Sequence, residues 1–371
     1  MANLNSWQRI DRVIAGKPFG DGIDGDYNSS TIPTMTYRSC SGSASSTTLT
    51  LTSAGFSNGD LILIHQTRGT GAGQWEINYV VSGGGTTSLT LLKPLYYTYT
   101  DSGASQAQAV KIPRYNNVTC PSGTWTVPSW NGDTGGILVL AARGTVTIAG
   151  TKNGKGVGFV KGSQENAPSY NGEGTGGPSS RAGDVANGNG GGGSNDRTPN
   201  GGGSGGGNGT AGVAGGGNFN AGASAGSADL TMMVFGGGGG GGETVNNGYG
   251  GNGGGICVMF AKNIMVTGGM NFSGNNGNNA TSDGGGGGGG AGGSILIVCQ
   301  SATLGSSLIT ATGGSGGNGS GGAYNGGAGG VGRIALHYSG TYSGSTNPTL
   351  YANQDTTLVE SVGGIFFHNF L

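Results

Sequence analysis

The chain has 371 residues and is nearly neutral, with 16 basic and 17 acidic side chains and only 9% charged residues. That balance excludes the strong positive field by which proteins bind nucleic acid. Its 90 glycines far exceed ordinary usage of about 7%, and disorder is the default interpretation of such a composition. Collagen is excluded, because the unbroken glycine runs 236–242 and 284–290 have no Gly-X-Y period.

The apolar runs of the chain are short. Residues 137–142, 256–261 and 295–299 form runs of five or six residues, which cannot cross a bilayer and are typical of strands. The first residues lack the apolar segment of a secretory signal. We therefore expect no membrane insertion, no signal peptide and a location in a virion, at a tail or tail-fibre tip.

Residues 1–134 predict a compact all-β domain, a sandwich or a barrel-like fold, that serves as the attachment foot. Turn residues such as Asn58-Gly59 separate short apolar or alternating segments. All four tryptophans of the chain fall in this part, which provides enough apolar area for a core. Strands are predicted at 48–52, 61–66, 75–81, 88–92, 109–115 and 124–127.

Two motifs in this domain invite a functional interpretation. Residues 69–73 alternate glycine with other residues as a nucleotide-binding loop does, but Gln74 replaces the third glycine and no helix pattern follows, which favours a hairpin turn. The acidic stretch from Asp21 to Asn28 could bind calcium, although it lacks EF-hand spacing, or could serve as Asx-turn caps. The sequence leaves calcium binding open and predicts no other metal site and no cofactor.

The four cysteines, Cys40, Cys120, Cys257 and Cys299, lie far apart in no C-x-x-C arrangement, which gives no support to a zinc or redox site. Buried free thiols are favoured for Cys257 and Cys299, which lie within apolar strand patterns. A bridge between Cys40 and Cys120 stays possible at this point.

From residue 135 a repeat appears, so that residues 135–371 form a second, glycine-rich head. Two glycines introduce an apolar strand at 135–141, 254–261 and 292–298, and a looser copy spans 330–336. The last three copies start about 38 residues apart, and second strands are predicted at 145–149, 264–267 and 308–312. One such unit cannot bury its apolar face alone, so we expect the units to stack.

Glycine tracts leave this β-stack as recurrent excursions. Because residues without a Cβ allow close approach of backbones, adjacent tracts can adopt a polyproline-II-like helix of three residues per turn and pair their N–H and C=O groups with one another. We expect packed polyglycine-II helices, stabilised by the apolar strands at their flanks. The excursions lie around 171–177, 187–193, 201–217, 236–255, 284–293 and 313–332.

Glycine runs that are interrupted by short Asn, Ser and aromatic segments, after a glycine-poor module, resemble the polyglycine-II sandwich adhesins at the long tail-fibre tips of T-even-type phages. The resemblance covers residues 150–335 and depends on the two seven-glycine runs and on the segments 250–255 and 316–322. It implies stacked glycine helices, with the loops at their distal end contacting the host receptor.

Receptor contacts are expected where larger side chains interrupt the glycine tracts, because a glycine surface offers no specificity. An aromatic ring beside an amide suits a sugar or a polar protein loop. The alternative is that the rings seal lattice edges. The candidate residues are Tyr170, Asn218, Phe219, Tyr249, Phe272, Tyr324 and Asn325.

No catalytic set can be nominated, and the sequence predicts that the chain is not an enzyme. Carboxylates of the head are scattered through loops, and His65, His337 and His368 lie in or beside apolar segments, where a structural histidine is commoner than a catalytic one. The predicted function is a phage receptor-binding adhesin. Its expected partners are a host surface glycan or outer-membrane protein and, through residues 1–134, other tail proteins.

Two other functions stay open: a structural subunit of a virion or extracellular fibre, and an ice-binding protein. A final apolar segment, 365–371, is predicted to close the β-stack as a strand. The sequence does not identify the host, the receptor or the oligomeric state.

Overall fold

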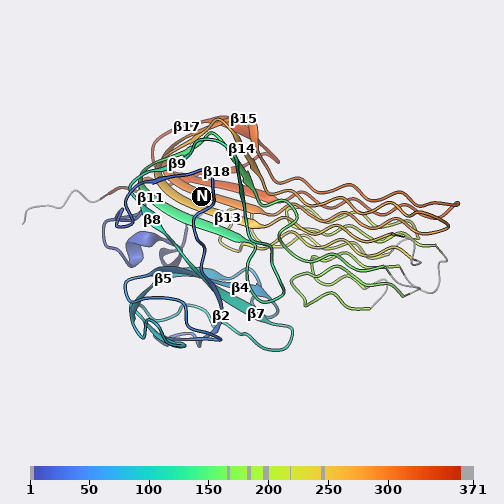
Figure 1. Ribbon diagram of the computed structural model, residues 1–371, viewed down its shortest axis with the longest axis horizontal. Coiled ribbons are helices and arrows are strands. Elements are labelled where there is room, and N and C mark those ends of the chain that lie inside the picture. Colours follow the sequence, from blue (N-terminus) through green and yellow to red (C-terminus); the bar gives the residue numbers. More distant parts are fainter. Residues whose placement is uncertain are drawn as a thin grey trace, which may run out of the picture.

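A computed structural model describes residues 4–164, 168–181, 185–194, 200–217, 219–243 and 247–360. Over that part of the chain the regular structure is almost wholly β (Figure 1), which confirms the predicted all-β class. Two short 3-10 turns, η1 (Ser6–Gln8) and η2 (Ile10–Arg12), are the exceptions among the described residues. No described helix is long and apolar enough to span a membrane, and the predicted final strand 365–371 lies outside the described residues.

The N-terminal part contains a closed antiparallel barrel in the strand order β2-β3-β6-β5-β4-β7. Four of the predicted strands are confirmed as β3 to β6, whereas β2 was missed because its sequence, Tyr-Arg-Ser-Cys-Ser, does not alternate apolar and polar residues. Leu49, Ile62, Ile64 and Leu89 fill the interior. The bounds are β2 (Tyr37–Ser41), β3 (Thr48–Leu51), β4 (Leu61–Arg68), β5 (Trp75–Ser82), β6 (Ser88–Leu91) and β7 (Gln106–Lys111).

A parallel sheet lies against this barrel, and its long central strands are β11 (Ile137–Ile148), β13 (Ile256–Val266) and β15 (Ser294–Thr310). Ile256 pairs with Ser294, and Ser294 pairs with Arg333 of the next strand, so the predicted repeat of about 38 residues is confirmed as a parallel register. The strands that extend the sheet beyond β15 are β16 (Arg333–Tyr338), β17 (Tyr342–Asn347) and β18 (Tyr351–Gln354).

The predicted second strands 145–149, 264–267 and 308–312 are largely continuations of β11, β13 and β15, not separate strands after a turn. In β11 the register shifts between Ala142 and Thr145, where Arg143-Gly144 lets the strand bend without ending. The short strands β12 (Thr151–Asn153) and β14 (Gly269–Asn271) follow β11 and β13 and lead into the glycine-rich segments.

The parallel sheet also includes strands that precede residue 135. The predicted strand 109–115 is divided at Pro113, which cannot donate a hydrogen bond: β7 ends at Lys111 in the barrel, and β8 (Arg114–Tyr115) pairs with β11. The predicted strand 124–127 forms β10 (Thr124–Thr126), which pairs with β12. The other edge takes β1 (Tyr27–Asn28) and β9 (Val118–Cys120).

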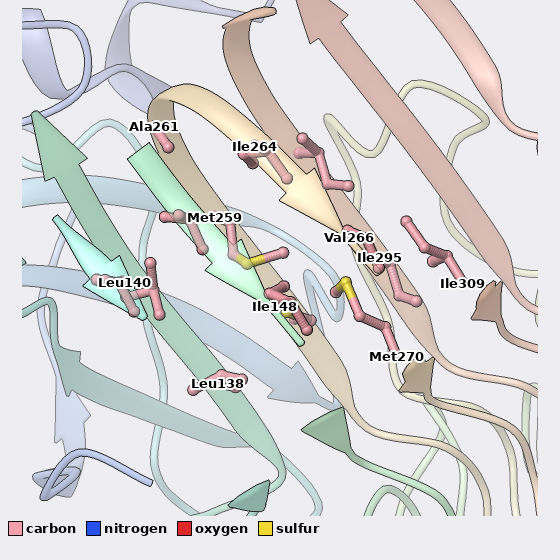
Figure 2. Packing of buried hydrophobic residues seen from close by; sticks show 14 of the residues in the cluster. Leu138, Leu140, Ile148, Met259, Ala261, Ile264, Val266, Met270, Ile295 and Ile309 are labelled. Carbon is pink, nitrogen blue, oxygen red and sulfur yellow. The ribbon is translucent and has the colours of Figure 1, made fainter. Parts of the chain in front are cut away.

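Alternate residues of the central strands enter two different cores, so both faces of the parallel sheet are buried. Leu138 and Leu140 pack with Met259 and Ile295 inside the curved sheet, as Figure 2 shows. Ile137, Val139 and their counterparts on β13 and β15 face the opposite way and pack against the barrel. Burial on both faces explains why the strands are uninterrupted apolar runs.

All four cysteines are buried and free, so Cys40 and Cys120 are not bridged. Cys40 belongs to the barrel core, whereas Cys120 and Cys257 belong to the core inside the parallel sheet. Burial raises the pKa of the Cys257 and Cys299 thiols to about 12, so these groups stay protonated and behave as small apolar side chains.

The glycine-rich segments leave the parallel sheet together and run side by side as a long bundle, which Figure 1 shows extending away from the strands. Each pair of consecutive segments runs outward and back. Twelve segments can be followed in the described chain: 157–164, 168–174, 187–194, 200–209, 210–217, 219–225, 236–243, 247–255, 272–279, 284–293, 311–320 and 324–332. The distal end of the bundle is the end farther from the parallel sheet.

Candidate functional site

Hydrogen bonds hold the bundle together with a period of three residues. In the segment 236–243, Gly236 and Gly239 donate their N–H groups to one neighbour, Gly237 and Gly240 to a second, and Gly238 to a third. The neighbours, in that order, are the segments 247–255, 200–209 and 168–174. Successive residues therefore point in three directions about the axis of the segment, which is the geometry of a helix with three residues per turn.

Three segments, 200–209, 236–243 and 284–293, are each surrounded by six others. For 284–293 the N–H groups donate in rotation to 324–332, 272–279 and 236–243, while its carbonyls accept from 200–209, 247–255 and 311–320. In the described chain the remaining nine segments surround these three. The bundle thus has an interior of three segments and a periphery of nine.

This arrangement explains the seven-glycine runs. A Cβ added at Gly239 would overlap the carbonyl of Gly288, and one at Gly240 would overlap that of Gly192. A Cβ at Gly241 would overlap the carbonyl of Ser163, so three successive positions are closed by three different neighbours. An interior segment therefore excludes almost every side chain. The Ser204 side chain is an exception, and it is buried with its hydroxyl donating to the Phe219 carbonyl at 3.0 Å.

Peripheral segments carry their exposed side chains on the side that no neighbour covers. In 311–320 the exposed residues Ser315 and Asn318 are three positions apart, with one pair of glycines between them. The segment 272–279 has fewer glycines and presents Asn276 and Asn279 in the same spacing. The number of glycines in a segment therefore reports how many neighbours surround it.

Most of the predicted receptor-binding residues lie near the distal end. The Tyr170 carbonyl accepts from Gly241, and the Tyr324 carbonyl accepts from Gly286, both at the distal parts of interior segments. Tyr324 is 48% exposed and Asn325 is also exposed. Asn325 is held in place, because its Oδ1 accepts from the Gly319 N–H at 2.8 Å.

Two of the predicted aromatic residues are buried, and Asn218 lies outside the described residues. Phe219 is 2% exposed, with its ring against Gly201. Phe272 is 0% exposed, with its ring over Gly154 close to β14, at the opposite end from the tips. Both rings fill space that glycine leaves open, which is the edge-sealing alternative. They offer no surface to a receptor in this conformation.

A polar face of the bundle adjoins Tyr249 and was not singled out from the sequence. Two shallow grooves meet on it and share Asn276 and Asn278. The Lys161 ammonium lies 4.7 Å from the centre of the Tyr249 ring. The sequence signal that could have located this polar face is the recurrence of Asn and Ser at every third position beside glycines. We call this surface the amide face; its residues are Lys155, Lys161, Tyr249, Asn252, Asn276, Asn278, Asn279, Ser315 and Asn318.

Comparison with known proteins gives few relatives. No family model matches the chain, and no curated protein matches it. Among solved structures it is similar to the Gp54 tailspike of Acinetobacter baumannii bacteriophage AP22 in complex with A. baumannii capsular saccharide, at 9% sequence identity and a TM-score of 0.21. The match covers 84% of this chain, which spans about 40% of the length of that tailspike.

The prediction that the chain is not an enzyme is wrong as stated: the solved structure that it matches is a tailspike in complex with a capsular saccharide, and this match neither excludes nor establishes enzymatic activity. The barrel has a groove lined mainly by Ser and Thr hydroxyls that contains Asp101. Burial raises the pKa of Asp101, and the charge of Asp133 raises it further, against a hydrogen bond from Gln106.

Three of the other acidic residues that the sequence drew attention to have structural partners. Glu173 is buried and paired with Arg68, and Glu243 accepts the Gly201 N–H at 3.2 Å. Burial acts to raise the pKa of Asp229, but hydrogen bonds from Ser227 and Thr231 outweigh it and lower the pKa. Asp283 is exposed, and the remaining candidates, Glu165, Asp184 and Asp196, lie outside the described residues.

The acidic stretch that could have bound calcium instead holds the edge of the parallel sheet. Asp21 forms an ion pair of 2.8 Å with Arg114, and Asp24 accepts the Arg114 N–H at 2.7 Å. Asp26 accepts the N–H of Asn117 at 3.0 Å. Among the described residues there is no cluster of His, Cys, Asp and Glu that could hold a metal ion.

The two described histidines also serve the core. His65 is buried with Nε2 2.7 Å from the Met233 carbonyl and Nδ1 3.0 Å from the Thr67 hydroxyl. Burial lowers the pKa of His65 to about 4 and also lowers that of His337, so both rings are neutral near pH 7. Neither lies on the outward surface of the bundle, and His368 lies outside the described residues.

Proposed function

We propose that the glycine-rich segments are polyglycine-II helices, arranged as in the sandwich adhesins of T-even-type phage tail fibres. The support is the rotation of hydrogen-bond partners every three residues and the close contact of successive interior glycines with three different neighbouring segments. Such a helix has no internal hydrogen bonds, so the bundle depends on bonds between helices and on the strands of the parallel sheet, at or near which six of the twelve segments begin or end.

We propose further that the protein is a receptor-binding protein of a phage tail or tail-fibre tip, which recognises a bacterial surface glycan or an outer-membrane protein. The observation that carries this proposal is a bundle whose backbone is held by hydrogen bonds between neighbouring segments and whose exposed side chains occupy outward positions of the peripheral segments. Tyr170, Tyr249, Tyr324 and Asn325 meet the solvent near its distal end. A fixed backbone lowers the entropy cost of recognition.

In this proposal the N-terminal barrel within residues 1–134 attaches the protein to other tail proteins. The barrel lies beside the parallel sheet, at the end of the molecule opposite the tips of the bundle (Figure 1). The attachment and receptor surfaces would then be separated by the full length of the glycine helices. At a TM-score of 0.21, the likeness to a tailspike carries no weight here, so the proposal depends on the residues of this chain.

The test is adsorption of the purified full chain to a panel of bacterial strains, together with protection of an adsorbing strain from infection. Replacement of Tyr170, Tyr249 and Tyr324 by alanine together should lower adsorption at least about tenfold, a loss of roughly 1.4 kcal/mol. The matched control replaces Ile23, Val81 and Tyr342, which are also exposed but lie outside the bundle. Equal adsorption by both variants would refute the distal site, and assembly into fibres without adsorption would favour a structural role.

A further inference from the structure

We propose that the amide face binds an acidic polysaccharide, lying along the bundle rather than at its tip. This inference rests on the proposed function and names the chemical class of the receptor. It follows from three features of the face: its two adjoining grooves, the fixed orientation of its carboxamides, and two lysines without an acidic partner.

The two grooves follow the surface of four neighbouring segments. One is lined by Lys155, Lys161, Asn252 and Asn275, the other by Asn279, Ser315 and other residues, and they meet at Asn276 and Asn278. None of the described residues that line either groove is acidic. A long ligand could therefore follow both grooves without meeting a carboxylate.

The carboxamides of this face present donors to the solvent. The Oδ1 atom of Asn276 accepts the Ser315 N–H at 3.0 Å, and Oδ1 of Asn279 accepts the Asn318 N–H at 2.8 Å. Because each oxygen is held by the backbone of the neighbouring segment, the NH2 group of each side chain is turned away from it. No hydrogen bond within the described chain engages these two NH2 groups. Fixed donors suit the oxygens of a sugar or a carboxylate.

Lysine charge is concentrated at one end of the face. Neither Lys155 nor Lys161 forms an ion pair with any described residue, although six ion pairs occur elsewhere in the described chain. Lys161 lies over the Tyr249 ring, 4.7 Å from its centre, which fixes both the cation and the aromatic surface. An aromatic platform beside a cation matches the apolar face and the carboxylate of an acidic sugar.

The spacing of the face is regular, which favours a repeating ligand. Asn276 and Asn279 are three residues apart, as are Ser315 and Asn318. At about 3.1 Å per residue, each pair is separated by roughly 9 Å along the helix axis. A polymer with a repeating unit can present equivalent groups to successive outward positions of the amide face. A single small sugar would contact only one of these positions.

The experiment measures retention of the purified full chain on immobilised hyaluronan and alginate, which are acidic, and on dextran, which is neutral. We expect retention on an acidic polymer at about 50 mM salt that is lost by about 200 mM, because released counterions drive such binding. Lys155→Gln with Lys161→Gln should weaken retention at least about tenfold. The matched control, Lys17→Gln with Lys93→Gln, removes the same charge from the N-terminal domain and should be retained like the wild type.

A second variant tests the orientation of the carboxamides. Asn276→Asp with Asn279→Asp keeps the oxygens that accept from Ser315 and Asn318 but replaces the outward donors by negative charge, so it should fold normally and lose retention. Equal retention on dextran, or no retention on either acidic polymer, would overturn the inference. If retention fails in this way but adsorption to bacteria still depends on Tyr170, Tyr249 and Tyr324, the proposed receptor-binding function stands and only the acidic-polysaccharide inference falls.

Discussion

Arg68 of the barrel and Glu173 of a peripheral glycine segment form a buried ion pair, 105 positions apart in sequence. The Glu173 carboxylate also accepts from the Trp130 indole at 3.0 Å and from the Val160 N–H at 2.9 Å. Its backbone carbonyl accepts from Gly238, in an interior segment. One residue thus connects the barrel, the loop before the parallel sheet and the bundle.

Replacement of Glu173 by glutamine should lower the free energy of unfolding by about 3–5 kcal/mol, because it leaves the Arg68 guanidinium buried without a counter-charge. Urea unfolding of the purified chain measures this loss. The matched control is Lys111→Gln, which breaks the more exposed pair of Lys111 and Asp60 and should cost less than about 1 kcal/mol. Equal losses for the two variants would contradict the role of Glu173 as a connecting residue.

Alanine in place of Gly288 should destabilise the bundle by about 1–3 kcal/mol or more, because its Cβ would overlap the Ser204 carbonyl of a neighbouring segment. The exposed Ser315 occupies an outward position of a peripheral segment, and Ser315→Ala should change stability by less than about 0.5 kcal/mol. Thermal unfolding compares the two variants. Similar melting temperatures for the Gly288→Ala and Ser315→Ala variants would contradict the close backbone packing around Gly288.

Protonation of His65 should weaken the fold in mild acid. Burial lowers its pKa from 6.5 to about 4 in the folded state, so the unfolded chain binds the proton more readily between these values. Stability is therefore complete above about pH 6.5 and declines as the pH falls towards 4, by about 3 kcal/mol in total. Urea unfolding at several pH values measures the slope, and His65→Gln should flatten it. An unchanged slope would show that another group is responsible.

The buried ammonium group of Lys152 should lower the free energy of unfolding at neutral pH. It is 1% exposed, and its ammonium lies 3.8 Å from the centre of the Trp125 ring without a hydrogen-bond partner in the described chain. Burial lowers its pKa, so the unfolded state binds the proton more tightly and wild-type stability should rise as the pH approaches 10.5.

We therefore expect Lys152→Met to raise the free energy of unfolding by about 1–2 kcal/mol at pH 7, with a smaller gain near pH 10. The control Lys155→Met, at an exposed position, should give no gain. A melting temperature of the Lys152→Met variant below that of the wild type would indicate that the contact with Trp125 outweighs the cost of burying the charge.

The local pattern of the sequence was sufficient for the class of fold and for most strands. Apolar alternation located β3 to β6, and the repeat of about 38 residues gave the parallel register of β13, β15 and β16, because a strand buried on both faces must be apolar throughout. The seven-glycine runs indicated closely packed backbones, because only a residue without a Cβ allows them.

Only the tertiary structure decided which segments lie inside the bundle and which side chains reach the solvent. Phe219 and Phe272 are aromatic interruptions like Tyr324, but their neighbours bury them, whereas Tyr324 meets the solvent. Asn276 and Asn279 are unremarkable in sequence, yet the neighbouring segment fixes their carboxamides and makes them a surface of donors. A period of three in the sequence indicates which positions face outward. Whether a side chain at such a position is exposed, and how it is oriented, depends on contacts between segments that are remote in the chain.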